Sequence, residues 1–64
     1  LRPGATGRGV EELQALLNVL DFSLSEDGLY GATTVAAVKV FQAKMNLADD
    51  GVVGRLTWNA LLDF

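Results

Sequence analysis

Eight carboxylates carry most of the acid–base and metal-binding chemistry open to this chain, because histidine and cysteine are absent. They are Glu11, Glu12, Asp21, Glu26, Asp27, Asp49, Asp50 and Asp63. Without imidazole or thiol, the chain lacks the usual general base, the thiol nucleophile and the common nitrogen ligand of metals. A glycosidase needs two carboxylates across a cleft that holds a sugar ring, and a chain of 64 residues rarely forms such a cleft. We therefore expect a domain that is not an enzyme by itself and uses no cofactor.

Two Asp-Gly turns, Asp27-Gly28 and Asp50-Gly51, could belong to calcium-binding loops. If each glycine took the sixth position of such a loop, the twelfth would fall on Thr34 and on Thr57 rather than on the bidentate glutamate that calcium requires. We therefore expect no metal site. The simpler interpretation is a turn in which the aspartate bonds to the backbone and the glycine takes a positive φ.

The two turns belong to an internal repeat, because residues 50–64 overlay residues 27–41 with six of 15 positions identical. The identical pairs are Asp27/Asp50, Gly28/Gly51, Gly31/Gly54, Thr34/Thr57, Ala37/Ala60 and Phe41/Phe64. Each copy reads as a turn followed by a helix, and two copies are too few for a solenoid. We expect Thr34, in the first turn of its helix, to bond to a free backbone N–H or to the Asp27 carboxylate.

Apolar periodicity predicts three helices, over about residues 8–20, 32–45 and 55–62. The second is apolar over most of its circumference, which is typical of a buried helix, so we expect the others to pack against it. In the first helix, Gln14 and Asn18 lie beside the apolar face, where they could bond to neighbouring loops. Asn46 is expected to end the second helix in a left-handed conformation. The predicted fold class is all-α: a compact, monomeric three-helix bundle with two repeated Asp-Gly turn–helix units.

The charge and hydropathy of the chain argue against further classes of function. The net charge is −3 and the five basic residues are scattered, which argues against binding to nucleic acid or to anionic lipid. No apolar run approaches the ~20 residues of a membrane span, and no signal peptide is seen. We expect one domain over residues 1–64, with residues 1–7 as an entry loop or the end of a linker.

The ordered motifs closely resemble the peptidoglycan-binding domain family of three-helix modules. They are Gly9-Val10-x-x-Leu13-Gln14-x-x-Leu17, then Asp27-Gly28-Leu29-Tyr30-Gly31-x-x-Thr34-x-x-Ala37-Val38-x-x-Phe41-Gln42, then Asp50-Gly51-Val52-Val53-Gly54-x-x-Thr57-Trp58-x-x-Leu61. The match covers nearly the whole chain. Tyr30 stands where the family often has Phe, and Asn46 where it often has Gly.

The resemblance implies a non-catalytic module that attaches a hydrolase, such as a phage endolysin, amidase or lytic transglycosylase, to peptidoglycan. Its partners would be the glycan strand, the stem peptide or both, together with an attached catalytic domain. It would act in the cell envelope, periplasmic or extracellular, or reach the host periplasm as part of an endolysin. The alternative is a structural or protein-interaction domain of the same fold, like the propeptide domain of metalloproteinases.

A peptidoglycan binder needs exposed hydrogen-bonding groups beside an apolar or aromatic wall, because its ligand presents amides, hydroxyls and carboxylates. We expect both helix starts to face one shallow groove. One side of it would be formed by Asp27, Gly28, Leu29, Tyr30, Gly31 and Thr34, with Gln42, Trp58 and Asn59 as further contacts. The Tyr30 ring is the expected aromatic contact.

Overall fold

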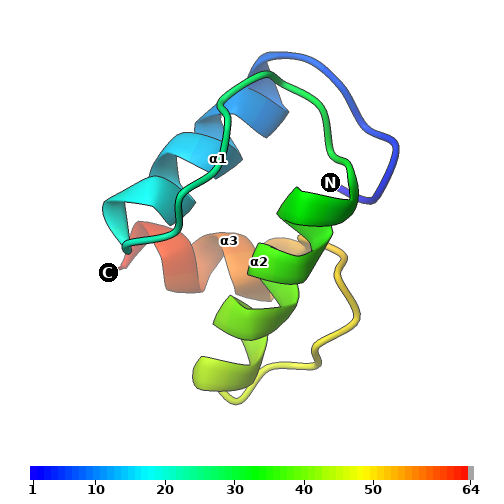
Figure 1. Cartoon of the computed structure of the whole chain (residues 1–64). Coiled ribbons are helices and arrows are strands. Elements are labelled where there is room, and N and C mark those ends of the chain that lie inside the picture. The colour runs from blue at the N-terminus through cyan, green and yellow to red at the C-terminus, as the bar shows by residue number, and fades with distance from the viewer. Residues whose placement is uncertain (64) are drawn as a thin grey trace.

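The computed structural model describes residues 1–63 and consists of three helices joined by two loops: α1 (Arg8–Val19), α2 (Ala32–Lys44) and α3 (Arg55–Leu62) (Figure 1). No β-strand occurs among the described residues, and the one isolated β-bridge joins Thr6 to Leu29. The predicted all-α, three-helix fold is confirmed. Phe64, the second member of the predicted Phe41/Phe64 pair, lies outside the described residues.

Helices α1 and α2 end in the same way, with a non-glycine residue in the left-handed conformation. Asp21 has φ 74° and Asn46 has φ 59°. The next N–H, of Phe22 or Leu47, donates to a carbonyl five residues back, that of Leu17 at 3.2 Å or of Gln42 at 2.8 Å. This pattern satisfies carbonyls that the helix end would leave free. The left-handed conformation of Asn46 was predicted from its residue type and is confirmed, whereas that of Asp21 was not predicted.

The core lies between the three helices, and α1 and α2 supply most of its buried apolar side chains. Val10, Leu13 and Leu17 are each 0% exposed, and Phe41 of α2 is 2% exposed. Helix α2 is not buried on all sides as its composition suggested, because Val40 is 47% exposed and Lys39 is also exposed. Small and β-branched apolar side chains therefore lie on the solvent face of α2 as well, and the helix is buried on one side only.

The N-terminal segment, residues 1–7, is hydrogen-bonded to both loops rather than hanging free. The Tyr30 N–H donates to the Ala5 carbonyl and the Gly4 N–H to the Tyr30 carbonyl, each at 3.0 Å. At the other loop, the Val53 N–H donates to the Leu1 carbonyl at 2.6 Å. In Figure 1 this segment (blue) runs beside the loop that precedes α2 (green). The segment thus fixes the two repeated turns relative to each other.

The Tyr30 side chain also joins the two turns. Its ring is only 2% exposed, and its hydroxyl donates to the Gly51 carbonyl at 2.6 Å. Burial, with a smaller contribution from the negative charge of Asp50, raises the pKa of Tyr30 to about 12. Tyr30 is therefore a core residue that connects one repeat to the other.

Tyr30→Phe is expected to destabilise the domain by about 1–3 kcal/mol, because it leaves the Gly51 carbonyl without its buried donor. The raised pKa predicts a pH dependence as well. The folded state holds the phenolic proton more tightly than the unfolded state, whose tyrosine pKa is about 10. The Tyr30 contribution is therefore complete below pH ~10 and is lost as pH rises towards about 12. Urea unfolding of parent and variant at pH 7 and pH 11 measures both effects, and an equal loss of stability in the two proteins between these pH values would contradict the assignment.

Candidate functional site

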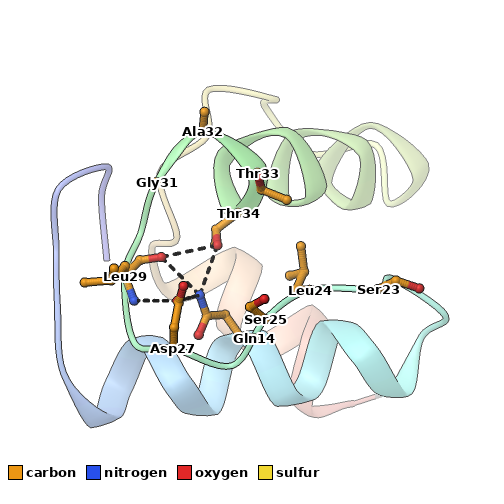
Figure 2. Close-up of a pocket in the computed structure, with 10 residues that line it drawn as sticks. All are labelled: Gln14, Ser23, Leu24, Ser25, Asp27, Leu29, Gly31, Ala32, Thr33 and Thr34. Carbon is orange, nitrogen blue, oxygen red and sulfur yellow. Dashed lines mark hydrogen bonds between the residues drawn. The ribbon is translucent and has the colours of Figure 1, made fainter.

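A buried glutamine organises the loop before α2. Gln14 projects from α1 and is 1% exposed. Its Nε2 donates to the Leu29 carbonyl at 3.0 Å and to Asp27 Oδ1 and Thr34 Oγ1, both at 3.1 Å (Figure 2). Its Oε1 accepts the Gly28 N–H at 3.0 Å. One side-chain amide thus fixes the Asp-Gly turn and the first turn of α2 together.

Gln42 forms the same network in the second repeat. Its Nε2 donates to the Val52 carbonyl at 2.9 Å, to Thr57 Oγ1 at 3.2 Å and to Asp50 Oδ1 at 3.3 Å, while its Oε1 accepts the Gly51 N–H at 3.1 Å. The internal repeat therefore includes the glutamine of the preceding helix. The separation in sequence is 13 residues from Gln14 to Asp27 but 8 from Gln42 to Asp50. An overlay without a gap hides this equivalence.

Both Asp-Gly turns need glycine at their second position, because the backbone φ is positive there and other atoms approach closely. Gly28 and Gly51 have φ of 73° and 75°, in the region that L-residues rarely adopt. A Cβ on Gly28 would stand 3.1 Å from the Gly7 carbonyl oxygen, and one on Gly51 would stand 3.2 Å from the Val35 side chain. The predicted positive φ at both turns is confirmed. The prediction for Thr34 was wrong, because its hydroxyl accepts from Gln14 and donates to the Leu29 carbonyl at 3.5 Å.

A groove of about 290 Å³ opens between the loop before α2 and the start of α2 itself, and we call it the first groove. Its lining residues are Gln14, Ser23, Leu24, Ser25, Asp27, Leu29, Gly31, Ala32, Thr33 and Thr34. In Figure 2, Gln14, Asp27 and Thr34 meet at one end, while Ser25 and Leu24 stand opposite Thr33. Ser25 and Thr33 are exposed and supply hydroxyls at the rim.

The wall formed by Ser23, Leu24 and Ser25 is held by Asn18 of α1. The Leu24 N–H donates to Asn18 Oδ1 at 2.7 Å, and Asn18 Nδ2 donates to the Leu24 carbonyl at 2.9 Å. Asn18 Nδ2 also donates to Glu26 Oε2 at 3.0 Å. The Asn18 amide therefore bonds both the N–H and the carbonyl of Leu24, as a residue on a neighbouring β-strand would. These bonds fix a connector that has no regular secondary structure. The expectation that Gln14 and Asn18 bond to neighbouring loops is confirmed.

Of the described residues that line the first groove, only Asp27 has a charged side chain. Its Oδ1 accepts the Leu29 N–H at 3.0 Å and Gln14 Nε2 at 3.1 Å. The bond from the Leu29 N–H, followed by that from Gln14, lowers the pKa of Asp27, so the carboxylate is ionised at neutral pH. The groove therefore offers an anionic acceptor and hydroxyl groups, which suits a ligand rich in hydroxyl and amide donors.

The structure does not bring the predicted site residues together in one groove. Asp27, Leu29, Gly31 and Thr34 line the first groove, with Gly28 buried in the turn beside it. Gln42 lines a separate groove, while Trp58 and Asn59 line neither. Tyr30 is buried, so the ring expected to contact ligand packs in the core instead. Thr34 and Gln42 are also buried, with their polar atoms engaged inside the protein.

The separate groove, which we call the second groove, lies at the start of α3 and has a volume of about 190 Å³. Its lining residues are Gln42, Leu47, Ala48, Asp50, Val52, Gly54, Arg55, Leu56 and Thr57. Among residues 1–63, none lines both grooves. Each repeat therefore forms its own groove, in place of the single groove between them that the sequence suggested.

Several groove residues were not predicted from the sequence. Ser23, Ser25 and Thr33 line the first groove without any motif that marks them. Gln14 had a usable signal: it follows the buried Leu13 as Gln42 follows the buried Phe41, so each repeat is preceded by a buried apolar residue and glutamine. A polar residue next to a core position at corresponding places in two repeats indicates a shared buried network.

The acidic side chains are too dispersed to form a metal site in the described part of the chain. Among residues 1–63, no three His, Cys, Asp or Glu side chains gather closely enough to hold a metal ion. Within the same residues, none of the helices has the length and hydrophobicity that crossing a bilayer requires.

Comparison with known proteins gives one consistent family. The family model described as "Putative peptidoglycan binding domain" matches residues 6–61. N-acetylmuramoyl-L-alanine amidase CwlL of Bacillus licheniformis is 44% identical over 64 residues, which cover 95% of this chain and 18% of the amidase. The chain thus spans less than a fifth of that relative.

Solved structures agree with this match. The SleB N-terminal domain superposes with a TM-score of 0.95 at 36% identity, covering 98% of this chain and 88% of that one. The Burkholderia AP3 phage endolysin gives a TM-score of 0.93 at 41% identity, covering 95% of this chain and 24% of the endolysin.

Proposed function

Because this chain belongs to the peptidoglycan-binding domain family, we propose that it binds bacterial peptidoglycan and holds an attached hydrolase at the wall. Similar domains occur in an amidase and in a phage endolysin, of which this chain spans only 18% and 24%. The attached catalytic domain, a location at the cell wall or outside the cell, and a non-catalytic role for this domain are parts of the same proposal.

The observation that carries the proposal is the first groove. Its rim has the hydroxyls of Ser25 and Thr33, and its inner end has the ionised Asp27. Peptidoglycan supplies matching donors in the hydroxyls and N-acetyl amides of its sugars. The hydrogen bonds of Gln14 and Asn18 keep both walls in place before ligand arrives, which reduces the entropy that binding would otherwise cost.

The groove is shallow, so we expect weak binding per site. A repetitive polymer and a tethered enzyme raise the effective concentration, so a weak module is sufficient to hold a hydrolase at its substrate. In our proposal the predicted site residues that line the first groove and are exposed, Asp27, Leu29 and Gly31, contact ligand. Gly28 and Thr34 support the turn, and Gln42 supports the second repeat.

Thr33→Glu is expected to weaken binding to purified, insoluble sacculi several-fold in a pull-down assay. The longer side chain occupies the first groove and places a second carboxylate near Asp27. A carboxylate in the first turn of a helix favours the fold, so the loss would not come from unfolding. Ala36→Glu is the matched control, because Ala36 lies exposed on the same helix, outside both grooves, and gives the same change in charge.

The pull-down also separates the proposal from its alternative. Equal binding by the two glutamate variants would place the ligand elsewhere. Failure of the parent domain to bind sacculi at all would favour a structural or protein-interaction domain of the same fold.

A further inference from the structure

The second groove repeats the hydrogen-bond network of the first but has a different lining. At two successive positions of the following helix, Arg55 stands in place of Ala32 and Leu56 in place of Thr33. On the wall opposite the helix, Ala48 stands in place of Ser25 and no counterpart of Ser23 lines the groove, whereas Leu47 and Val52 correspond to Leu24 and Leu29 of the first groove. The repeat has therefore kept the groove and exchanged hydroxyl groups for aliphatic side chains and one cation.

Arg55 is the group in this lining that is free to meet a ligand. It is exposed, and no hydrogen bond or ion pair joins its guanidinium to another residue within 1–63. The groove's other charged residue, Asp50, has the same bonds as Asp27 in the first groove, because its Oδ1 accepts the Val52 N–H at 2.9 Å and Gln42 Nε2 at 3.3 Å. A guanidinium presents paired donors that match the two oxygens of a carboxylate.

The aliphatic walls define the rest of the ligand. Leu56 and Val52 are 69% and 41% exposed, and Leu47 is partly buried beside them. Contact between this surface and methyl groups of a ligand is favourable, because it removes apolar area from water. The same aliphatic side chains have no hydrogen-bonding groups for a hydroxyl-rich sugar. The combination of one cation with three aliphatic side chains fits a short peptide of small apolar residues that carries a carboxylate.

We propose that the second groove binds the stem peptide of peptidoglycan, with Arg55 contacting a peptide carboxylate and Leu56 and Val52 contacting alanine methyl groups. This inference rests on the proposed function and adds to it a division between the grooves, in which the hydroxyl-lined first groove takes the glycan strand. Two weak contacts to linked parts of one polymer strengthen each other without a large interface.

Chemical-shift mapping with N-acetyl-D-alanyl-D-alanine tests the inference, because this probe has methyl groups and a carboxylate but no sugar. We expect chemical-shift changes in the amides of Val52 and of residues 54–57. For Arg55→Gln, the Kd from the titration should be at least five-fold higher than for the parent. The C-terminal amide of the same dipeptide, which lacks the carboxylate, should show the same weakening with the parent domain.

Arg8→Gln is the matched control, because Arg8 is also an exposed arginine at the first position of a helix and lines neither groove. It should titrate like the parent. Equal titration by Arg55→Gln and the parent would overturn the inference, as would shifts confined to residues 23–34. A domain that binds sacculi but shows no shift with the dipeptide would contradict this inference and leave the proposed function standing.

Discussion

Gln14→Glu is expected to unfold the domain, or nearly so, at neutral pH. The change keeps the shape of the side chain but replaces three donated hydrogen bonds with a carboxylate facing the Leu29 carbonyl and the ionised Asp27. Each buried group left without a partner costs about 1–3 kcal/mol, and more when it is charged. A domain of this size has only about 3–10 kcal/mol of stability in total.

The same variant should become more stable in acid. The folded environment disfavours the charged form of the introduced carboxylate, so its pKa is raised above the unfolded glutamate value of about 4.3. The stability recovered by protonation is present below that value and is lost as pH rises through the raised pKa. Urea unfolding between pH 4 and pH 7 measures this. Gln42→Glu should show the same dependence of stability on pH. Asn59→Asp is the control, because Asn59 is exposed, and its stability should differ little from that of the parent. Full stability of Gln14→Glu at pH 7 would contradict the network.

Phe41→Ala and Leu13→Ala are expected to destabilise the domain by about 3–5 and 2–5 kcal/mol respectively. Both side chains are buried in the core, Phe41 at 2% and Leu13 at 0% exposure, so truncation leaves a cavity as well as losing apolar burial. We expect the Phe41 variant to be largely unfolded by circular dichroism at 25 °C.

Leu62→Ala and Val40→Ala are the controls, because these side chains are 68% and 47% exposed on α3 and α2. Each should cost well under 1 kcal/mol. A folded Phe41→Ala protein with normal stability and lost wall binding would move Phe41 from the core to the binding site.

Most of the fold follows from local patterns in the sequence. Helical spacing located α1, α2 and α3 to within about a residue, and the Asp-Gly pairs identified both positive-φ turns. The part that failed was the burial of α2. The sequence of a helix predicts which of its faces are apolar but not which faces another segment covers. Val40 is an apolar residue of α2 that faces solvent because no segment packs over it.

The site was harder to predict because its parts depend on how the loops fold back. Tyr30 has the residue type of a sugar-contacting aromatic, yet the N-terminal segment and the Gly51 carbonyl enclose it. Ser25 and Thr33 have ordinary residue types and are brought together across the groove only by the Asn18 bonds and the Gln14 network. Unequal connector lengths also hid the equivalence of Gln14 and Gln42.

Chemical-shift mapping of the labelled domain with a soluble muropeptide tests the central claim most directly, since it locates the contact as well as detecting it. The account predicts that the amides of residues 23–34, around the first groove, shift in a saturable way and that those on the solvent face of α1 do not. Shifts that cluster instead on the Arg8–Leu20 segment, with residues 23–34 unchanged, would contradict it.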